Sequence, residues 1–143
     1  MKKILLLCLV ALFALAGCSK PEPEPIDISG TTWTGTFAQD MDNGGTVFHY
    51  VQEVTLSFVD ASTGTLSRVV SIELDGTPFN TTTWDNAFDY VTTADGGTIT
   101  FRNTEPDCDA LTPRDFTVEG DQLTIEGRSY VGNETVTWTL NKQ

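Results

Sequence analysis

Apolar and polar residues alternate with a period of two along most of the chain after residue 26. In the clearest run, residues 48–58, large apolar side chains occupy one face and polar side chains largely occupy the other. Strict alternation in segments rich in Thr, Val and aromatic residues is typical of half-buried antiparallel strands. Similar runs occur at 32–37, 65–74, 88–90, 99–101, 116–118, 123–125 and 136–140. The pattern predicts an all-β protein of roughly eight or nine strands.

Glycine-containing turn signals separate these runs. They are Asn43-Gly44, Asp75-Gly76, Asp95-Gly96 and Gly120-Asp121, and Gly64 and Gly132-Asn133 are expected to close two further turns. Such residues favour tight hairpins. No stretch has sustained helical periodicity, although residues 83–87 are expected to have room for one short helical turn. Sequential hairpins favour an antiparallel up-and-down β-barrel of about eight strands over the alternative, a β-sandwich.

The N-terminus has a different organisation. Lys2 and Lys3 precede an apolar run at residues 4–15, and the small residues Ala16 and Gly17 follow it. This three-part arrangement predicts a secretory signal. The run has about 12 residues, fewer than the roughly 20 that a membrane-spanning helix needs, which favours cleavage over the alternative of an uncleaved anchor.

The segment Leu15-Ala16-Gly17-Cys18 resembles the lipobox of bacterial lipoproteins. The resemblance implies a signal peptide at residues 1–17, lipid attachment at Cys18 and stable anchoring by several acyl chains. Ser19, directly after that cysteine, resembles lipoproteins that are sorted to the outer membrane, and the basic-then-acidic stretch that follows resembles the export tags of some surface-exposed lipoproteins. We therefore expect a lipid-anchored protein of the cell outer membrane, facing either the periplasm or the cell surface.

Removal of the signal also changes the composition. Pro and Glu alternate over residues 21–25, which favours an extended tether at residues 18–27, and residues 28–143 form the expected barrel domain. The whole chain has 8 Lys and Arg against 20 Asp and Glu, and loss of Lys2 and Lys3 leaves 6 against 20, a formal charge of −14. So acidic a surface repels phosphate backbones, which excludes nucleic acid as a partner.

We expect no disulfide within the domain. Cys8 leaves with the signal and Cys18 is acylated, so Cys108 is the one cysteine left in the domain. The carboxylates that flank Cys108 disfavour its thiolate, and we expect no redox role for it.

Two further segments resemble lipocalin-like (calycin) domains. Residues 30–37, Gly-Thr-Thr-Trp-Thr-Gly-Thr-Phe, resemble their first strand, and residues 116–125 with 137–142 resemble the last strands of small bacterial lipocalin-like lipoproteins. The resemblance implies that Trp33 packs across the closed end of a barrel and that a late basic residue caps it, for which Lys142 is the candidate. It also implies a barrel that holds a small, often apolar, ligand.

Alternation places two polar residues on apolar strand faces. Arg68 lies on the inward face of its strand, and Gln52 interrupts the inward row after Tyr50. A buried guanidinium is costly, so an inward Arg68 requires a carboxylate, a wet lumen or an anionic ligand. The alternative is a β-bulge that turns Arg68 outward. We interpret Arg68, Gln52, Tyr50 and Tyr90 as candidate residues of a ligand-binding lumen.

Trp84 lies in a polar segment with poor alternation, between three threonines and Asp85-Asn86. If exposed, it is a candidate surface contact that stacks on a sugar or a protein partner. The alternative is that Trp84 caps one end of the barrel.

Signals for catalysis are sparse. His49 is the only histidine, and neither a zinc-protease motif, a nucleophile elbow nor a phosphate-binding loop occurs. Residues 40–44 resemble a calcium loop only superficially, because Asn43 and Gly44 stand one place early. We expect no enzymatic activity, no metal site and no cofactor, although plentiful acidic residues leave carboxylate-pair chemistry open.

The sequence therefore predicts a non-enzymatic, lipid-anchored envelope protein whose lipocalin-like barrel binds or carries a small ligand. The alternative is a scaffold or interaction protein of the outer membrane, whose loops at 81–86 and 104–113 contact another protein or a glycan. A carrier needs an unfilled lumen, whereas a scaffold fills its barrel with its own side chains.

Overall fold

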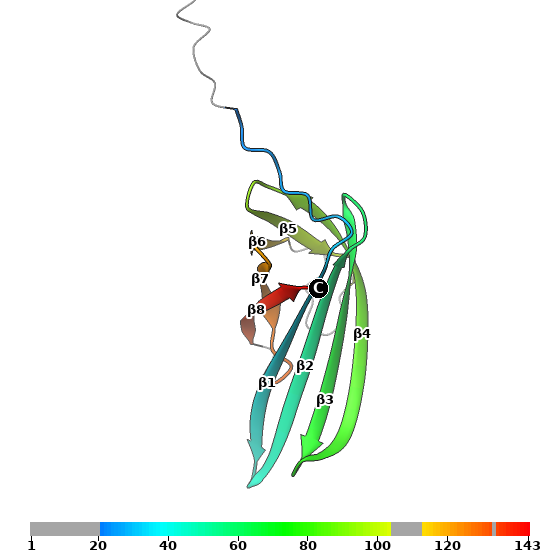
Figure 1. The fold of residues 1–143 in the computed structure, drawn as a ribbon. Coiled ribbons are helices and arrows are strands. Elements are labelled where there is room, and N and C mark those ends of the chain that lie inside the picture. Colours follow the sequence, from blue (N-terminus) through cyan, green and yellow to red (C-terminus); the bar gives the residue numbers. More distant parts are fainter. Residues whose placement is uncertain (1–20, 104–112, 133) are drawn as a thin grey trace, which may run out of the picture.

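The chain folds as a closed antiparallel barrel of eight strands, in which each strand is hydrogen-bonded to the next along the sequence and β8 returns to β1 (Figure 1). The computed structural model describes residues 21–103, 113–132 and 134–143. No helix occurs in these residues, and so none is long and apolar enough to cross a membrane. The predicted all-β fold and up-and-down barrel are confirmed, and the β-sandwich alternative is wrong.

The strands follow the predicted alternation. Their bounds are β1 Thr32–Asn43, β2 Thr46–Phe58, β3 Thr63–Leu74, β4 Thr77–Thr92, β5 Gly96–Phe101, β6 Arg114–Glu119, β7 Gln122–Arg128 and β8 Thr135–Lys142. The β3–β4 turn has positive φ at both Asp75 (49°) and Gly76 (75°), as a tight primed turn requires. The short helical turn expected at residues 83–87 is wrong, because this segment pairs with β3 as part of β4.

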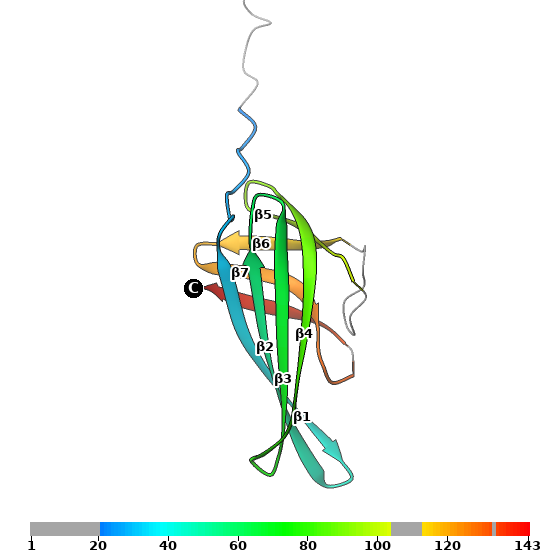
Figure 2. The ribbon, with the colours of Figure 1, turned by 90° about the vertical axis from the view of Figure 1, so that its right-hand side faces the viewer.

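Two halves of unequal strand length make up the barrel. Strands β1 to β4 have 12 to 16 residues each, whereas β5 to β8 have 6 to 8. Strand β1 pairs with β8 at only two positions, Trp33 with Lys142 and Thr34 with Asn141. The long strands therefore continue beyond the barrel as an open four-stranded sheet (Figures 1 and 2). We call residues 38–51 and 69–83 the sheet extension.

The apolar core fills the other end, which we call the closed end. The residues before β1 lie across it: the amide of Ile26 donates to the Thr93 carbonyl (2.8 Å), and the amide of Gly30 donates to the Phe58 carbonyl (2.7 Å). Ile28 in this segment is buried. The largest fully buried apolar side chains include Trp33, Phe58, Phe88, Phe101, Leu56, Ile99 and Leu140. This half of the lumen is filled by the protein's own side chains.

Trp33 occupies the position that the resemblance to lipocalin-like domains implies. Its indole Nε1 donates to Thr31 Oγ1 (2.8 Å), and Lys142 Nζ lies 5.8 Å from the centroid of the Trp33 ring. A cation over an indole face is favourable, so Lys142 caps the tryptophan from the last strand. The barrel is thus compatible with a lipocalin-like fold.

Candidate ligand-binding site

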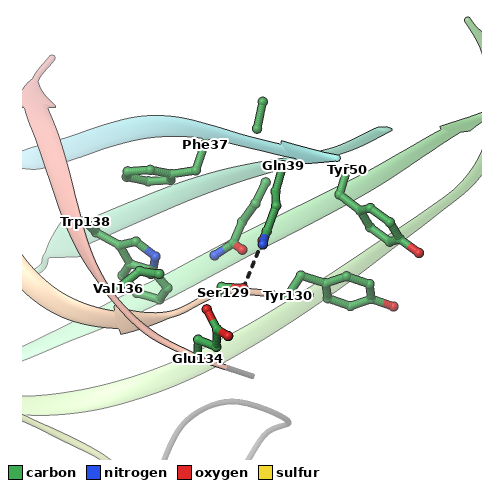
Figure 3. A pocket seen from close by; sticks show the side chains of 10 residues that line it. Phe37, Gln39, Tyr50, Ser129, Tyr130, Glu134, Val136 and Trp138 are labelled. Carbon is green, nitrogen blue, oxygen red and sulfur yellow. Dashed lines mark hydrogen bonds between the residues drawn. The ribbon is translucent and has the colours of Figure 1, made fainter. Parts of the chain in front are cut away.

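A pocket of about 250 Å³ lies at the open end of the barrel, where the sheet extension begins. Strands β1, β2 and β8 and the segment that follows β7 form its walls (Figure 3). Its apolar and aromatic lining residues are Phe37, Ala38, Tyr50, Tyr130, Val136 and Trp138. Its polar lining residues are Gln39, Gln52, Ser129 and Glu134. The lumen is therefore filled at the closed end and open at this end.

Trp138 forms part of the apolar wall of the pocket, and a glycine lets its ring lie against the neighbouring strand. A Cβ atom added to Gly127 would come within 2.1 Å of Trp138 Cε2, so only glycine fits behind the indole. The Phe37 ring lies 6.5 Å from the Trp138 ring, centroid to centroid. Trp138 is 1% exposed, although one side of its ring faces the pocket.

Two buried polar groups face the same space. Trp138 Nε1 is buried, and no hydrogen-bond acceptor is paired with it among the residues that the structure describes. Gln52 is 5% exposed, and its Nε2 donates to the Arg128 carbonyl at 3.4 Å, a long contact. Both groups retain hydrogen-bonding capacity toward the pocket.

The rim of the pocket is more polar. The Ser129 hydroxyl has two acceptors, the Val131 carbonyl and the side-chain oxygen of Gln39 (3.0 Å), and the second contact joins β1 to the segment after β7 across 90 residues of sequence (Figure 3). The Ser129 amide donates to the Glu134 carbonyl (2.9 Å), while the Glu134 side chain is exposed. These contacts hold the connection between β7 and β8 against the mouth of the pocket.

Arg68 lies behind this mouth. It is 2% exposed, so the structure decides between the two orientations that alternation left open, and the side chain faces inward. A bulge does occur in this pair of strands, but it falls at Ile72/Glu73, beyond Arg68. The guanidinium carbon of Arg68 lies 5.4 Å from the Trp84 ring centroid and 5.9 Å from that of Tyr130. The arginine therefore contacts Tyr130, which lines the pocket, without lining it itself.

Trp84 is half-buried, and it is not the exposed surface residue on which the stacking hypothesis depended. It faces Arg68 across the β3–β4 pair, and its ring lies 5.7 Å from that of Tyr130. Tyr130 in turn lies 5.4 Å from Tyr50. Residues 81–86 are therefore part of a strand whose tryptophan packs on Arg68, and the expectation of a contact loop there is wrong.

Of the four candidate lumen residues, Tyr50 and Gln52 line the pocket, and Arg68 and Tyr90 are not among its lining residues. Tyr90 packs at the closed end with its ring 4.8 Å from that of Phe58, and its hydroxyl donates to the Asp60 carbonyl (2.5 Å). Burial raises the pKa of the Tyr90 phenol above its ordinary value. Its position is that of a core residue with a satisfied hydroxyl.

Sequence reasoning did not single out Trp138, Tyr130 or Ser129 as site residues. Alternation marks Trp138 as an inward aromatic residue, but it does not distinguish a packed indole from one that faces a pocket. Tyr130 and Ser129 follow the end of β7, where the period of two stops. An aromatic residue next to a turn signal was the only available hint.

Other candidate residues lie elsewhere or outside the described part of the chain. His49 pairs with Asp40 (2.5 Å), where both side chains are solvent-accessible. The Asp42 carboxylate accepts from the Gly45 amide (2.8 Å) at the hairpin turn between β1 and β2, which consists of Gly44 and Gly45, while residues 40–43 belong to β1. Within the described ranges, no three His, Cys, Asp or Glu side chains gather closely enough to hold a metal ion. Cys18 and Cys108 lie outside those ranges.

Comparison with protein-family models and with curated proteins found no match to this chain. The fold and the pocket therefore define the class of the protein by themselves. It is a closed eight-stranded antiparallel barrel, compatible with ligand binding, with one end filled and a pocket at the other.

Proposed function

We propose that this protein is a lipid-anchored lipoprotein of the cell envelope, with a lipocalin-like barrel that binds or carries a small ligand at its open end. The observation that carries the proposal is the pocket of about 250 Å³, walled mainly by apolar and aromatic side chains with a few polar groups. Ligand sites in proteins have this composition, and drug-sized ligands occupy roughly 300 to 1,000 Å³. The pocket therefore suits a compact ligand of about one ring, or the end of a larger one.

The path of the tether supports a defined orientation. Residues 21–25 are exposed and lead away from the closed end, whereas the sheet extension points in the opposite direction (Figures 1 and 2). With a lipid on Cys18, the closed end faces the outer membrane and the pocket opens away from it. The ligand then exchanges with the aqueous compartment, on either the periplasmic or the surface side.

We also infer that the pocket binds without catalysing a reaction. Among the described residues, the Ser129 hydroxyl lies within hydrogen-bonding distance of the Gln39 side-chain oxygen and the Val131 carbonyl, neither of which is a general base. Nucleophilic catalysis requires a general base within hydrogen-bonding reach of the hydroxyl. The site is thus chemically equipped to hold a ligand.

Native mass spectrometry of the protein purified from its own envelope tests the proposal. The wild type and Val91→Trp, which adds an indole at a 66% exposed position, should retain the same small molecule. Val136→Trp, which fills the pocket, should lose it while the barrel stays folded. The proposal is contradicted if the wild type carries no bound molecule. It is also contradicted if Val136→Trp retains the bound molecule as well as the wild type does.

One observation favours the alternative, an interaction protein of the envelope. Phe79 is 67% exposed on the sheet extension, with its ring 6.3 Å from that of Phe48. Phe48 is half-buried, so Phe79 presents an exposed aromatic ring that packs on a partly covered one on a protruding sheet, a feature that suits contact with a partner. A photo-crosslinking residue at position 79 should then capture one defined envelope protein in living cells. The same residue at Val59, which is 62% exposed near the closed end, should not.

A further inference from the structure

The two fully buried tryptophans of the barrel differ in their hydrogen bonding. Trp33 and Trp138 are each 1% exposed. Trp33 Nε1 donates to Thr31 Oγ1 (2.8 Å), whereas Trp138 Nε1 is paired with no acceptor in the described part of the chain. Buried donors are rarely left in this state, because desolvation is then uncompensated. The unpaired Nε1 donor of Trp138 therefore needs an explanation, whereas the paired donor of Trp33 needs none.

The position of Trp138 supplies that explanation. The indole lines the pocket, and Figure 3 shows its nitrogen on the side of the ring that faces the other lining side chains. Gln52 lies in the same lining, and its amide donor reaches the Arg128 carbonyl only at 3.4 Å. Trp138 Nε1 is covered by its neighbours, so an acceptor atom in the pocket would satisfy the indole by moving between the ring and the lining side chains beside it.

The rest of the lining restricts the charge of a ligand. Among the described residues that line the pocket, Glu134 is the only carboxylate, and the whole chain carries a formal charge of −12. An anion entering the pocket would be repelled. The nearby cation, Arg68, contacts the Trp84 and Tyr130 rings and does not line the pocket. Phe37, Val136 and the indole itself favour an apolar or aromatic body.

We propose that Trp138 Nε1 is the specificity donor of the pocket, and that the ligand is a neutral compound with a compact apolar or aromatic body and one acceptor oxygen, such as a carbonyl, directed at this indole. The inference rests on the proposed function of the pocket. It adds the chemical class of the ligand and the atom that selects it.

Two isosteric probes test the inference on the full-length protein with ¹⁵N-labelled tryptophan. Acetophenone carries a carbonyl oxygen, and α-methylstyrene replaces that oxygen with a methylene group of similar size. The wild type should bind acetophenone about 5- to 10-fold more tightly, which corresponds to one net hydrogen bond. Acetophenone should shift the indole resonance of Trp138 and leave that of Trp33 unchanged.

Two variants complete the design. Trp138→Phe removes the donor but keeps a ring, so it should bind both probes with equal affinity, close to that of the wild type for α-methylstyrene. Trp33→Phe removes an indole donor that is already satisfied, so it should keep the preference for acetophenone. If either variant fails to fold, the wild-type affinities and the identity of the shifted indole resonance still decide the matter.

The outcomes separate this inference from the proposed function. Binding of both probes in the pocket with equal wild-type affinity and no shift at Trp138 Nε1 overturns the inference, and the ligand-binding function stands. Absence of binding by either probe at millimolar concentration overturns the inference, and a wild type without bound ligand in native mass spectrometry then removes the proposed function as well.

Discussion

Gly127 and Trp138 together shape the wall of the pocket. The indole lies against the backbone of Gly127, where any β-carbon would overlap it at 2.1 Å. Gly127 belongs to β7, which pairs with β8, the strand that carries Trp138. The width of the pocket is therefore sensitive to a single methyl group at a position that does not line it.

Gly127→Ala is expected to push the indole into the pocket and to destabilise the barrel by about 1–3 kcal/mol, the usual cost of overpacking a core. Denaturant unfolding measures the change. In a Trp138→Leu background the same substitution should cost much less, because the overlap is removed. An equal cost in both backgrounds would show that the overlap with Trp138 is not the cause.

Arg68 is a buried cation that lies against two aromatic rings. Its guanidinium lies near the Trp84 and Tyr130 rings, which compensate part of the cost of burying a cation. A double-mutant cycle with Arg68→Met and Trp84→Leu should give a coupling free energy of about 0.5–2 kcal/mol. A coupling near zero, measured by denaturant unfolding, would mean that the rings merely surround the arginine.

At the scale of elements, the β2–β3 turn shows how a loop is stabilised by one carboxylate. The Asp60 side chain accepts hydrogen bonds from the Ser62 amide (2.9 Å), the Thr63 amide (2.8 Å) and the Thr63 hydroxyl (2.8 Å). These bonds favour the ionised form and hold the pKa of Asp60 below its ordinary value of 3.8. Because the folded-state pKa is the lower one, ionised Asp60 stabilises the fold above pH 3.8, and the effect is lost as the pH falls through the folded-state pKa.

Asp60→Asn keeps an acceptor oxygen but removes the titration. We expect the variant to be less stable than the wild type at pH 7 and to lose less stability between pH 5 and pH 2. Thermal unfolding across this range measures both effects. Parallel pH profiles for the two proteins would show that Asp60 does not contribute to acid sensitivity.

The alternation within each strand does not predict the sheet extension. Strands β1 and β4 continue well past their last pairing with β8 and β5, so two strand edges lie open there. The β1 edge carries Asp40 and Asp42, and the β4 edge has Pro78 next to a bulge. Charges, prolines and bulges discourage edge-to-edge association of strands.

At the scale of the whole molecule, the two ends of the barrel have separate roles. The closed end holds the filled core and the start of the tether, and the open end holds the pocket. The filled core and the pocket are therefore separated along the axis of the barrel.

The proposed anchor gives a direct test at this scale. Cys18→Ser should move the protein from the membrane fraction to the soluble fraction, because the acylated thiol is absent. Cys108→Ser is the matched control and should stay with the membrane. Intact-mass measurement of the wild type should show an acylated N-terminus at Cys18. Membrane retention of Cys18→Ser would contradict the lipoprotein proposal.

Much of this architecture follows from the sequence alone, because alternation is a local property. The side chains of a strand point to opposite faces with a period of two. The all-β class and the inward orientation of Gln52 can therefore be predicted without knowing any partner strand. Asp75-Gly76 likewise determines its own turn through backbone sterics. Tyr90 and Trp84 show where this reasoning ends, since alternation does not reveal that Tyr90 packs on Phe58 in the core or that Trp84 packs on Arg68.

Only the tertiary structure decided which inward residues surround a pocket and which fill a core. That distinction depends on what lies across the lumen, and the facing residues are far apart in sequence, as Gln39 and Ser129 are at 90 residues. It also depends on where the short strands stop, which leaves the indole of Trp138 beside open space while Trp33 is capped by Lys142. A local pattern sets the face of each residue, but the closure of the barrel sets its neighbours.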